Sequence, residues 1–324
     1  MSSMRTIILV ICLIMISGCI TTKQVAVKAR FPAAYPDATA LKRISVLGFQ
    51  GSDGAGFADQ LTAELKSANL DGQLIFSVMS KDVIKGRTGD IKTAMRHGKS
   101  LGVQGVYYGQ VDRLTMANRN WQQERTKCLE KKNFFKCKKS QKIKVTCYEQ
   151  LATYTAQPKL VNVLTGNIVY TESISSSSKN QYCTDTGRKF SNAEFNALLR
   201  KDVAAKVRRR VAPFNGVFNV KLKNDTDGLT GEARDKFKSG LSFSDAGQMD
   251  RACAIWQELS ALSAESNNNI SLVYNLGVCA EVVADYDRAL ELYSKADAML
   301  TAPDKVISAA RDRALKLKMN EKAI

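Results

Sequence analysis

Residues 160–170 read LVNVLTGNIVY, two short runs of β-forming residues on either side of a Thr-Gly pair. Such runs around a short glycine-containing stretch are typical of a β-hairpin. We predict a three-residue loop at Leu164-Thr165-Gly166, with Gly166 in the left-handed conformation that follows a type I turn. Val163 then faces Asn167, and the residue numbers of opposed positions add to 330 along the whole hairpin.

This register places two distant cysteines opposite each other. Cys147 and Cys183 also add to 330, and opposed β-carbons in antiparallel strands lie about 5 Å apart. A disulfide needs a slightly shorter separation, so a small strand adjustment suffices. Pro158 lacks an amide proton and implies an edge position or a bulge, which would shift the register by one residue. We therefore expect a Cys147–Cys183 bridge.

The other cysteines fit the same scheme. Six cysteines follow position 19, an even number that suggests disulfides in an exported protein. Cys128 and Cys137 are expected to pair across the segment between them. Cys253 and Cys279 remain as a third bridge or as two buried thiols.

Upstream of the hairpin, strand and helix patterns alternate. Residues 43–50, 73–79 and 103–114 read as strands, and amphipathic helices are expected at 57–68 and 93–101 with Ser80 as a helix N-cap. The glycines of residues 51–56 predict a tight turn rather than a phosphate loop, because no Gly-Lys-Ser/Thr ending follows. A helix at 193–211 and a strand at 214–223 complete an expected α/β domain at 41–223.

Several of these stretches resemble the curli-secretion lipoprotein (CsgG) family. They are the pattern V-N-V-x-T-G-x-I at 161–168, SVLGF at 45–49, FADQLT at 57–62 and LGVQGVYYG at 101–109. The resemblance implies a small α/β fold with an antiparallel hairpin. The fold is also similar to the N-terminal domain of TolB and to lipoprotein activators of penicillin-binding proteins, so fold alone leaves the function open.

The chain departs from the channel-forming members of that family in residues 117–149. Those members insert two amphipathic hairpin segments into the outer membrane. Here residues 117–147 hold ten Lys and Arg against two Glu, and each cation at the bilayer midplane costs roughly 2–4 kcal/mol. The second segment, near 173–195, is polar. We expect a solvated basic loop, or else a contact for an acidic partner or lipid head groups through Lys131, Lys132, Lys136, Lys138 and Lys139.

Residues 229–324 carry a repeated helical pattern. Gly240 and Ala252 stand twelve residues apart, as do Gly277 and Ala289, and residues 285–296 resemble the second helix of a tetratricopeptide repeat. We expect an all-α, tetratricopeptide-like domain of two repeats and a closing helix, which would dock a protein segment. Tyr286 and Tyr293 are candidate partner-binding residues. A purely structural cap on the first domain is the alternative.

The N-terminus predicts export and lipidation. Arg5 and an apolar run precede Ile16-Ser17-Gly18-Cys19, which resembles a bacterial lipobox. The resemblance implies a signal peptide at 1–18, acylation of Cys19 and, because no Asp follows, sorting to the periplasmic face of the outer membrane. An ordinary secreted protein is the alternative. Residues 19–40 read as a lipidated tether.

Composition restricts the remaining chemistry. The 324 residues carry a formal net charge of +17, which suits anionic lipid or an acidic partner; nucleic acid is disfavoured because the basic residues lack interleaved aromatics. His97 is the only histidine, and no cysteine cluster or nucleophile motif accompanies it. We therefore expect no enzyme activity, no cofactor and no metal.

Together these patterns predict an α+β protein with a CsgG-like domain and a tetratricopeptide-like domain. The expected function is assembly or partner binding in an envelope machine, such as a secretion system or surface-appendage apparatus. Expected partners are outer-membrane lipid, through the acyl chains on Cys19, and other envelope proteins; a homo-oligomer stays open. The alternative is regulation of peptidoglycan synthesis by binding a penicillin-binding protein, and a CsgG-type secretion pore is less favoured.

Overall fold

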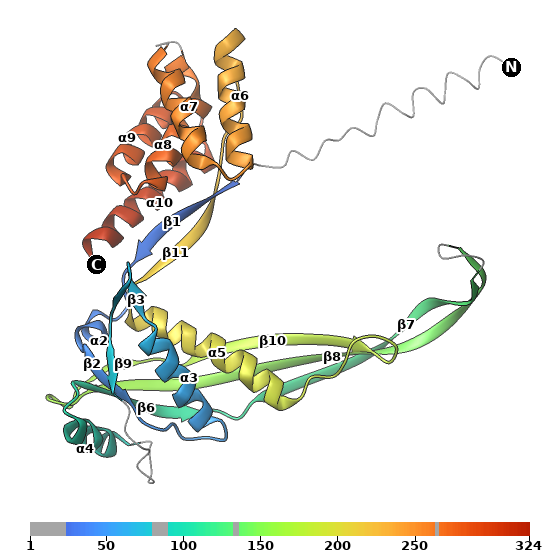
Figure 1. The fold of residues 1–324 in the computed structure, drawn as a ribbon, viewed down its shortest axis with the longest axis vertical. Coiled ribbons are helices and arrows are strands. Elements are labelled where there is room, and N and C mark those ends of the chain that lie inside the picture. Colours follow the sequence, from blue (N-terminus) through green and yellow to red (C-terminus); the bar gives the residue numbers. More distant parts are fainter. Residues whose placement is uncertain (1–23, 80–89, 132–135, 263–265) are drawn as a thin grey trace. The chain divides into compact units, whose positions relative to one another are not determined.

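The computed structural model describes residues 24–79, 90–131, 136–262 and 266–324. Both helices and strands are present (Figure 1), which confirms the α+β class. The chain divides into two compact units. The α/β unit spans residues 32–214, and the helical unit combines residues 24–31 with residues 215–323. The predicted signal peptide, Cys19 and Ser80 lie outside the described residues.

The α/β unit is built on a mixed sheet. Strands β2, β5 and β6 run parallel, whereas β8 is antiparallel to β6 and also pairs antiparallel with β7, β9 and β10. The strands are β2 (Arg43–Val46), β5 (Ser77–Met79), β6 (Gly105–Val111), β7 (Thr115–Lys131), β8 (Cys137–Asn162), β9 (Ile168–Thr171) and β10 (Ile174–Cys183), and a separate pair is β3 (Asn69–Leu70) with β4 (Gln73–Leu74).

Helices cover both faces at one end of this sheet. Helices α3 (Gly54–Lys66) and α5 (Asn192–Val211) share one core with the buried side chains of β8, while α4 (Ile91–Leu101) packs in a second core with β6 and the end of β8. The short helix α2 (Pro36–Ala40) precedes β2. His97 on α4 is buried, with Nε2 3.2 Å from Ser45 Oγ.

The glycine turn before α3 serves close packing. Gly51 has φ +103°, and a Cβ there would lie 2.0 Å from the carbonyl oxygen of Val111. Asp53, which follows in the turn, accepts hydrogen bonds from Arg200 at 2.8 Å and from Tyr154 at 2.9 Å. These contacts account for the turn without a bound phosphate.

The hairpin differs from its predicted loop but keeps its predicted register. Asn162 pairs with Asn167, so the loop has four residues, and the Asn162 side chain accepts hydrogen bonds from two loop amides. Gly166 is left-handed as predicted, with φ +76°. An irregularity between Leu160 and Val161 then restores the sum of 330, which holds along β10 from Ile174↔Ala156 to Cys183↔Cys147.

The helical unit contains two strands that the sequence analysis assigned elsewhere. Residues 24–31 were expected in the tether but form β1 (Gln24–Phe31), which pairs with β11 (Phe214–Lys221). Val25, Val27 and Ala29 alternate inward, so the period of two is that of a half-buried strand. Since Val25, Val27 and Val220 pack in the helical core, both expected domain limits, 40 and 223, are wrong.

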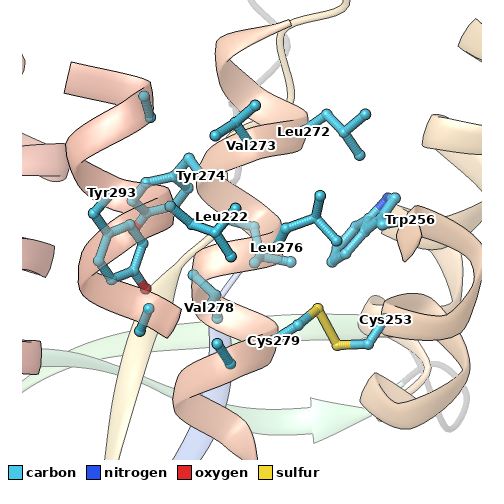
Figure 2. Close-up of a cluster of buried hydrophobic side chains, with 14 of the residues drawn as sticks. Leu222, Cys253, Trp256, Leu272, Val273, Tyr274, Leu276, Val278, Cys279 and Tyr293 are labelled. Atoms are coloured by element: carbon cyan, nitrogen blue, oxygen red, sulfur yellow. A yellow bond between two sulfur atoms is a disulfide. The ribbon is translucent and has the colours of Figure 1, made fainter. Parts of the chain in front are cut away.

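Among the described residues after β11, the structure has five α-helices besides the short 3₁₀ turn at 266–268. They are α6 (Gly231–Asp245), α7 (Met249–Leu262), α8 (Ile270–Val282), α9 (Tyr286–Ala298) and α10 (Lys305–Lys322). Their core surrounds Trp256, Tyr274 and Tyr293, and a disulfide joins Cys253 of α7 to Cys279 of α8 (Figure 2).

Candidate functional site

The first candidate surface is a basic ribbon, which we define as residues 119–131 and 136–146. The sequence suggested a loop, but β7 and β8 pair here from Arg119↔Glu149 to Lys131↔Cys137. Strand β10 ends at Cys183, opposite Cys147, so the ribbon continues past it with two strands only (Figure 1). The expected loop is therefore wrong, because the polar residues of both arms hydrogen-bond through their backbones as a long hairpin.

Two disulfides fix this ribbon. Cys147–Cys183 lies at its base, where the two Cα atoms are 3.9 Å apart, and Cys128–Cys137 lies near its far end with a Cα separation of 5.7 Å. Both pairings are those expected from the sequence. The Cys147–Cys183 bridge links β8 to β10, and the Cys128–Cys137 bridge links β7 to β8. The two strands of the ribbon therefore cannot separate freely at its far end.

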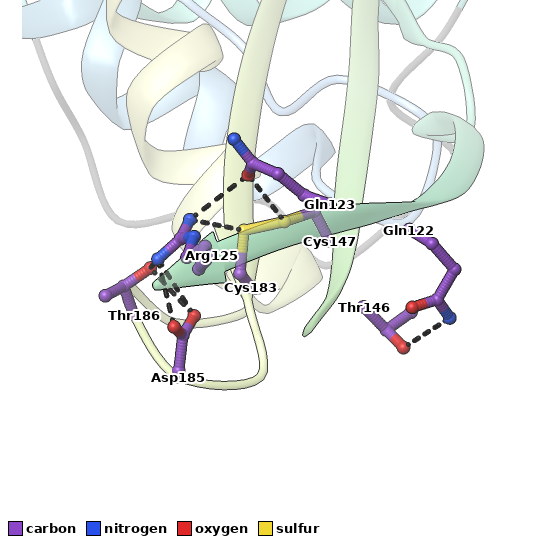
Figure 3. The surroundings of a disulfide bond; sticks show 8 residues. All are labelled: Gln122, Gln123, Arg125, Thr146, Cys147, Cys183, Asp185 and Thr186. Atoms are coloured by element: carbon purple, nitrogen blue, oxygen red, sulfur yellow. Dashed lines mark hydrogen bonds and ion pairs between the residues drawn. A yellow bond between two sulfur atoms is a disulfide. The ribbon is translucent and has the colours of Figure 1, made fainter. Parts of the chain in front are cut away.

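Arginine side chains reinforce the base of the ribbon. Arg125 binds the Asp185 carboxylate at 3.0 Å and donates to the Cys183 sulfur at 3.2 Å (Figure 3). The Glu149 carboxylate forms ion pairs with Arg119 at 2.7 Å and with Lys179 at 2.9 Å. Hydrogen bonds, first from Lys179 and to a smaller extent from Gln181, lower the pKa of Glu149 to about 2. This carboxylate therefore stays charged, and its partners link β8 to β7 and β10.

The lysines of the ribbon are more loosely held than its arginines. Lys138 pairs with Glu130 at 2.8 Å and Lys142 with Glu124 at 3.7 Å. Three others make no ion pair within the described residues, and they are Lys127, Lys139 and Lys144. The ribbon contains nine Lys and Arg residues but only two Glu residues, so its surface is strongly positive.

The sequence-predicted binding residues therefore fall into different places. Lys136, Lys138 and Lys139 are exposed on the ribbon. The side chain of Lys131 and all of Lys132 lie outside the described residues. Tyr286 and Tyr293, at 4% and 0% exposure, are wrong as surface candidates.

Both tyrosines are buried inside the helical unit, in two separate clusters. The Tyr293 ring lies 5.3 Å from the Tyr274 ring, and Tyr286 packs with Ala29 and Leu317. Burial also raises the pKa of Tyr293 above its usual value. A repeat pattern cannot separate such core positions from exposed ones, because both recur at the same helical period.

The second candidate surface is a groove on the helical unit, which we call the α7–α9 groove. It has a volume of about 640 Å³ and is lined by α7, the loop after it, α8 and α9. Leu276, Ala280 and Leu292 and the Cys253–Cys279 disulfide give it apolar walls. The sequence predicted a docking surface on this unit, but the two residues named for it, Tyr286 and Tyr293, do not line the groove.

Polar groups surround those apolar walls. Asp285 caps α9 by accepting a hydrogen bond from the Arg288 amide at 3.0 Å, and the Arg288 guanidinium pairs with Glu291 at 2.6 Å. Asp250 and Lys295 also line the groove and make no ion pair within the described part of the chain. A groove with apolar walls and a few polar groups at its rim suits a peptide segment better than a small charged substrate.

Comparisons with known proteins identify no family. No family model matches the chain, and no curated protein matches it. Solved structures that match include two PelC dodecamers from Paraburkholderia phytofirmans, one of them a point variant. The variant has 14% identity and a TM-score of 0.29, covering 58% of this chain and 98% of that chain. The other has 12% identity and a TM-score of 0.26, covering 58% and 99%. These similarities are too weak to support an inference about function.

Proposed function

We propose that this protein is an outer-membrane lipoprotein, anchored by acyl chains on Cys19, whose helical unit docks a segment of another envelope protein. The α7–α9 groove is the observation that carries the proposal. It combines about 640 Å³ of volume with an apolar floor, and grooves between helices that accept apolar side chains are a common mode of peptide recognition. The partner belongs to an assembly such as a secretion or surface-appendage apparatus.

The proposal includes two finer fold assignments, a tetratricopeptide-like helical unit and a CsgG-like α/β unit. In the helical unit, Gly240 packs against Trp256 and Gly277 against Tyr293. Both pairs are sixteen residues apart, which supports a tetratricopeptide-like repeat. In the α/β unit, the antiparallel hairpin of β8 and β9 beside the parallel strands β2, β5 and β6 supports the CsgG-like assignment, because the resemblance implies an α/β fold with such a hairpin. The described residues contain no helix that is long and apolar enough to cross a bilayer.

The ribbon argues against a pore-forming role. Its described side chains from Gln122 to Glu130 and from Cys137 to Lys144 include no run of alternating apolar residues on one face, and each lysine at the midplane would cost roughly 2–4 kcal/mol. We therefore place this hairpin outside the hydrocarbon of a bilayer.

Anchoring is tested at Cys19. Replacing it by Ser removes the thiol that receives diacylglycerol, so we expect loss of labelling by radioactive palmitate and loss of the processed form from outer-membrane fractions. Two acyl chains or more are needed for stable attachment. A Cys19→Ser protein that is still processed and labelled would show that the anchor lies elsewhere.

Docking is tested by filling the groove. Ala254 and Val283 are exposed residues that line it, so Ala254→Arg and Val283→Arg introduce bulk and charge without disturbing the core. We expect crosslinking in intact cells to recover the partner with the wild-type protein and to lose it with either variant.

The matched control is Ala309→Arg, an exposed alanine of α10 that does not line the groove. It should recover the partner as the wild type does. Unchanged recovery by both groove variants would move the docking surface away from the α7–α9 groove. Stimulation of a purified penicillin-binding protein by the wild type, lost in the groove variants, would select the cell-wall alternative.

A further inference from the structure

The outward charge of the basic ribbon comes from lysine. Both of its arginines are held by internal ion pairs, Arg119 with Glu149 and Arg125 with Asp185. Lys127, Lys139 and Lys144, by contrast, are exposed and make no ion pair within the part of the chain that the structure describes. The arginines therefore build the ribbon, and the lysines give it a positive surface.

The shape of the ribbon leaves those lysines accessible from both sides. From Gln122 to Glu130 and from Cys137 to Lys144, none of the described side chains is buried. About ten residue pairs at 3.4 Å per residue give an arm of roughly 34 Å beyond Cys147. Leu129, which is 51% exposed, presents an apolar side chain to solvent near the far end.

The ribbon is marginally stable for two reasons, its two-stranded pairing and its excess positive charge. A two-stranded hairpin is marginal in water, and nine cations against two Glu repel one another. Two disulfides hold it nonetheless. Since Lys127, Lys139 and Lys144 are exposed and make no ion pair within the described residues, their charge is available for an anionic ligand.

We infer that the basic ribbon binds the anionic head groups of a lipid bilayer, lying on the surface without entering the hydrocarbon. Lysine is a compact point charge, whereas fixed recognition of a single carboxylate favours the planar fork of arginine. Lysines spread over two faces therefore suit a diffuse anionic surface better than an acidic protein site. The inference rests on the proposed function only for the presence of a membrane nearby.

The size of the effect follows from the surface potential of anionic bilayers. Each Lys or Arg close to such a surface strengthens binding about fivefold. Replacing Lys127, Lys139 and Lys144 together by Gln should weaken binding by about a hundredfold. The same binding should fall as salt shortens the screening length from about 10 Å at 0.1 M to about 3 Å at 1 M.

The test measures vesicle binding by a chain that begins at Ile20, which keeps every described residue and carries no acyl group. We expect it to sediment with vesicles of phosphatidylglycerol and phosphatidylcholine but not with phosphatidylcholine alone. The Lys127→Gln, Lys139→Gln, Lys144→Gln variant should lose this binding. Because the chain is not acylated, a failed anchor assignment leaves the result unaffected.

The matched control removes the same charge elsewhere. Lys305, Lys316 and Lys322 are exposed on α10 and make no ion pair within the described residues, so their replacement by Gln should change binding less than twofold. A cooperative thermal unfolding transition, measured for both triple variants, should show that each of them folds. Equal binding to the two vesicle types, equal losses in the two triple variants, or binding of an acidic protein without vesicle binding would each overturn the inference.

Discussion

At the scale of single residues, two glycines explain how the helical repeats pack. A Cβ at Gly240 would lie 2.3 Å from Trp256 Nε1, and one at Gly277 would lie 2.5 Å from Tyr293 Cε1. Both rings are fully buried. The sequence paired each glycine with an alanine twelve residues on, but the atom that needs the space belongs to an aromatic ring sixteen residues on. A small residue shows that something approaches closely, and only the structure shows what.

We therefore expect Gly277→Ala to destabilise the helical unit. The new methyl group overpacks against a fully buried ring, at a cost of about 1–3 kcal/mol, while alanine's better helix propensity returns up to about 1 kcal/mol. Urea denaturation should show a net loss of about 1–2 kcal/mol. In a Tyr293→Leu background the same substitution should cost nothing further; an equal cost there would mean that the ring is not the obstacle.

At the scale of elements, the basic ribbon shows how composition misleads. Its polar, lysine-rich sequence suggested a loop, because strands usually carry alternating apolar residues. A ribbon exposed on both faces has no apolar face to display, so that signal is absent. Backbone pairing and two disulfides define it instead.

Removing the far disulfide should open the far end of the ribbon and leave the rest intact. Such a crosslink is worth roughly 2 kcal/mol or more, so Cys128→Ser with Cys137→Ser should raise the open population about thirtyfold. Limited trypsin digestion should then cut between Arg125 and Lys144 faster, with an unchanged unfolding midpoint for the helical unit. Cys253→Ser with Cys279→Ser is the control and should lower that midpoint without faster ribbon cleavage.

At the scale of the whole molecule, the α/β unit is an insertion in the helical unit. The chain forms β1 of the helical unit first, then all of residues 32–214, and returns with β11 to pair with β1. The units also differ in charge. Residues 32–214 hold 30 Lys and Arg against 15 Asp and Glu, whereas residues 24–31 and 215–323 together hold 16 against 16. The basic character of the protein therefore belongs to the inserted unit.

This division predicts which fragment folds alone. Residues 32–214 contain two complete cores and two disulfides, so the excised fragment should be soluble and give dispersed amide NMR spectra. A chain truncated after residue 228 keeps β1 and β11 but loses the helices that cover Val25, Val27 and Val220. It should bind hydrophobic dyes and aggregate on size exclusion. Monomeric behaviour of that truncated chain would contradict the division.

The sequence by itself determined what depends on neighbours along the chain. Periodicity predicted α5 and the helices after residue 229, and two β-forming runs around a Thr-Gly pair predicted the hairpin. Its register predicted the Cys147–Cys183 bridge even though the loop is one residue longer than expected, because an irregularity between Leu160 and Val161 compensates for the extra residue. The register predicted at the hairpin loop extends to Cys147 and Cys183 because opposed positions in an antiparallel pair remain opposed until a bulge intervenes.

Only the tertiary structure decided what depends on distant partners. Strands β1 and β11 are separated by the whole α/β unit, so no local pattern could show that they pair. The alternation of Val25, Val27 and Ala29 indicates a strand but not the sheet it joins. Tyr286 and Tyr293 likewise became core residues through helices that pack over them. Burial and pairing are properties of the folded whole, because the free energy of each contact depends on what covers it.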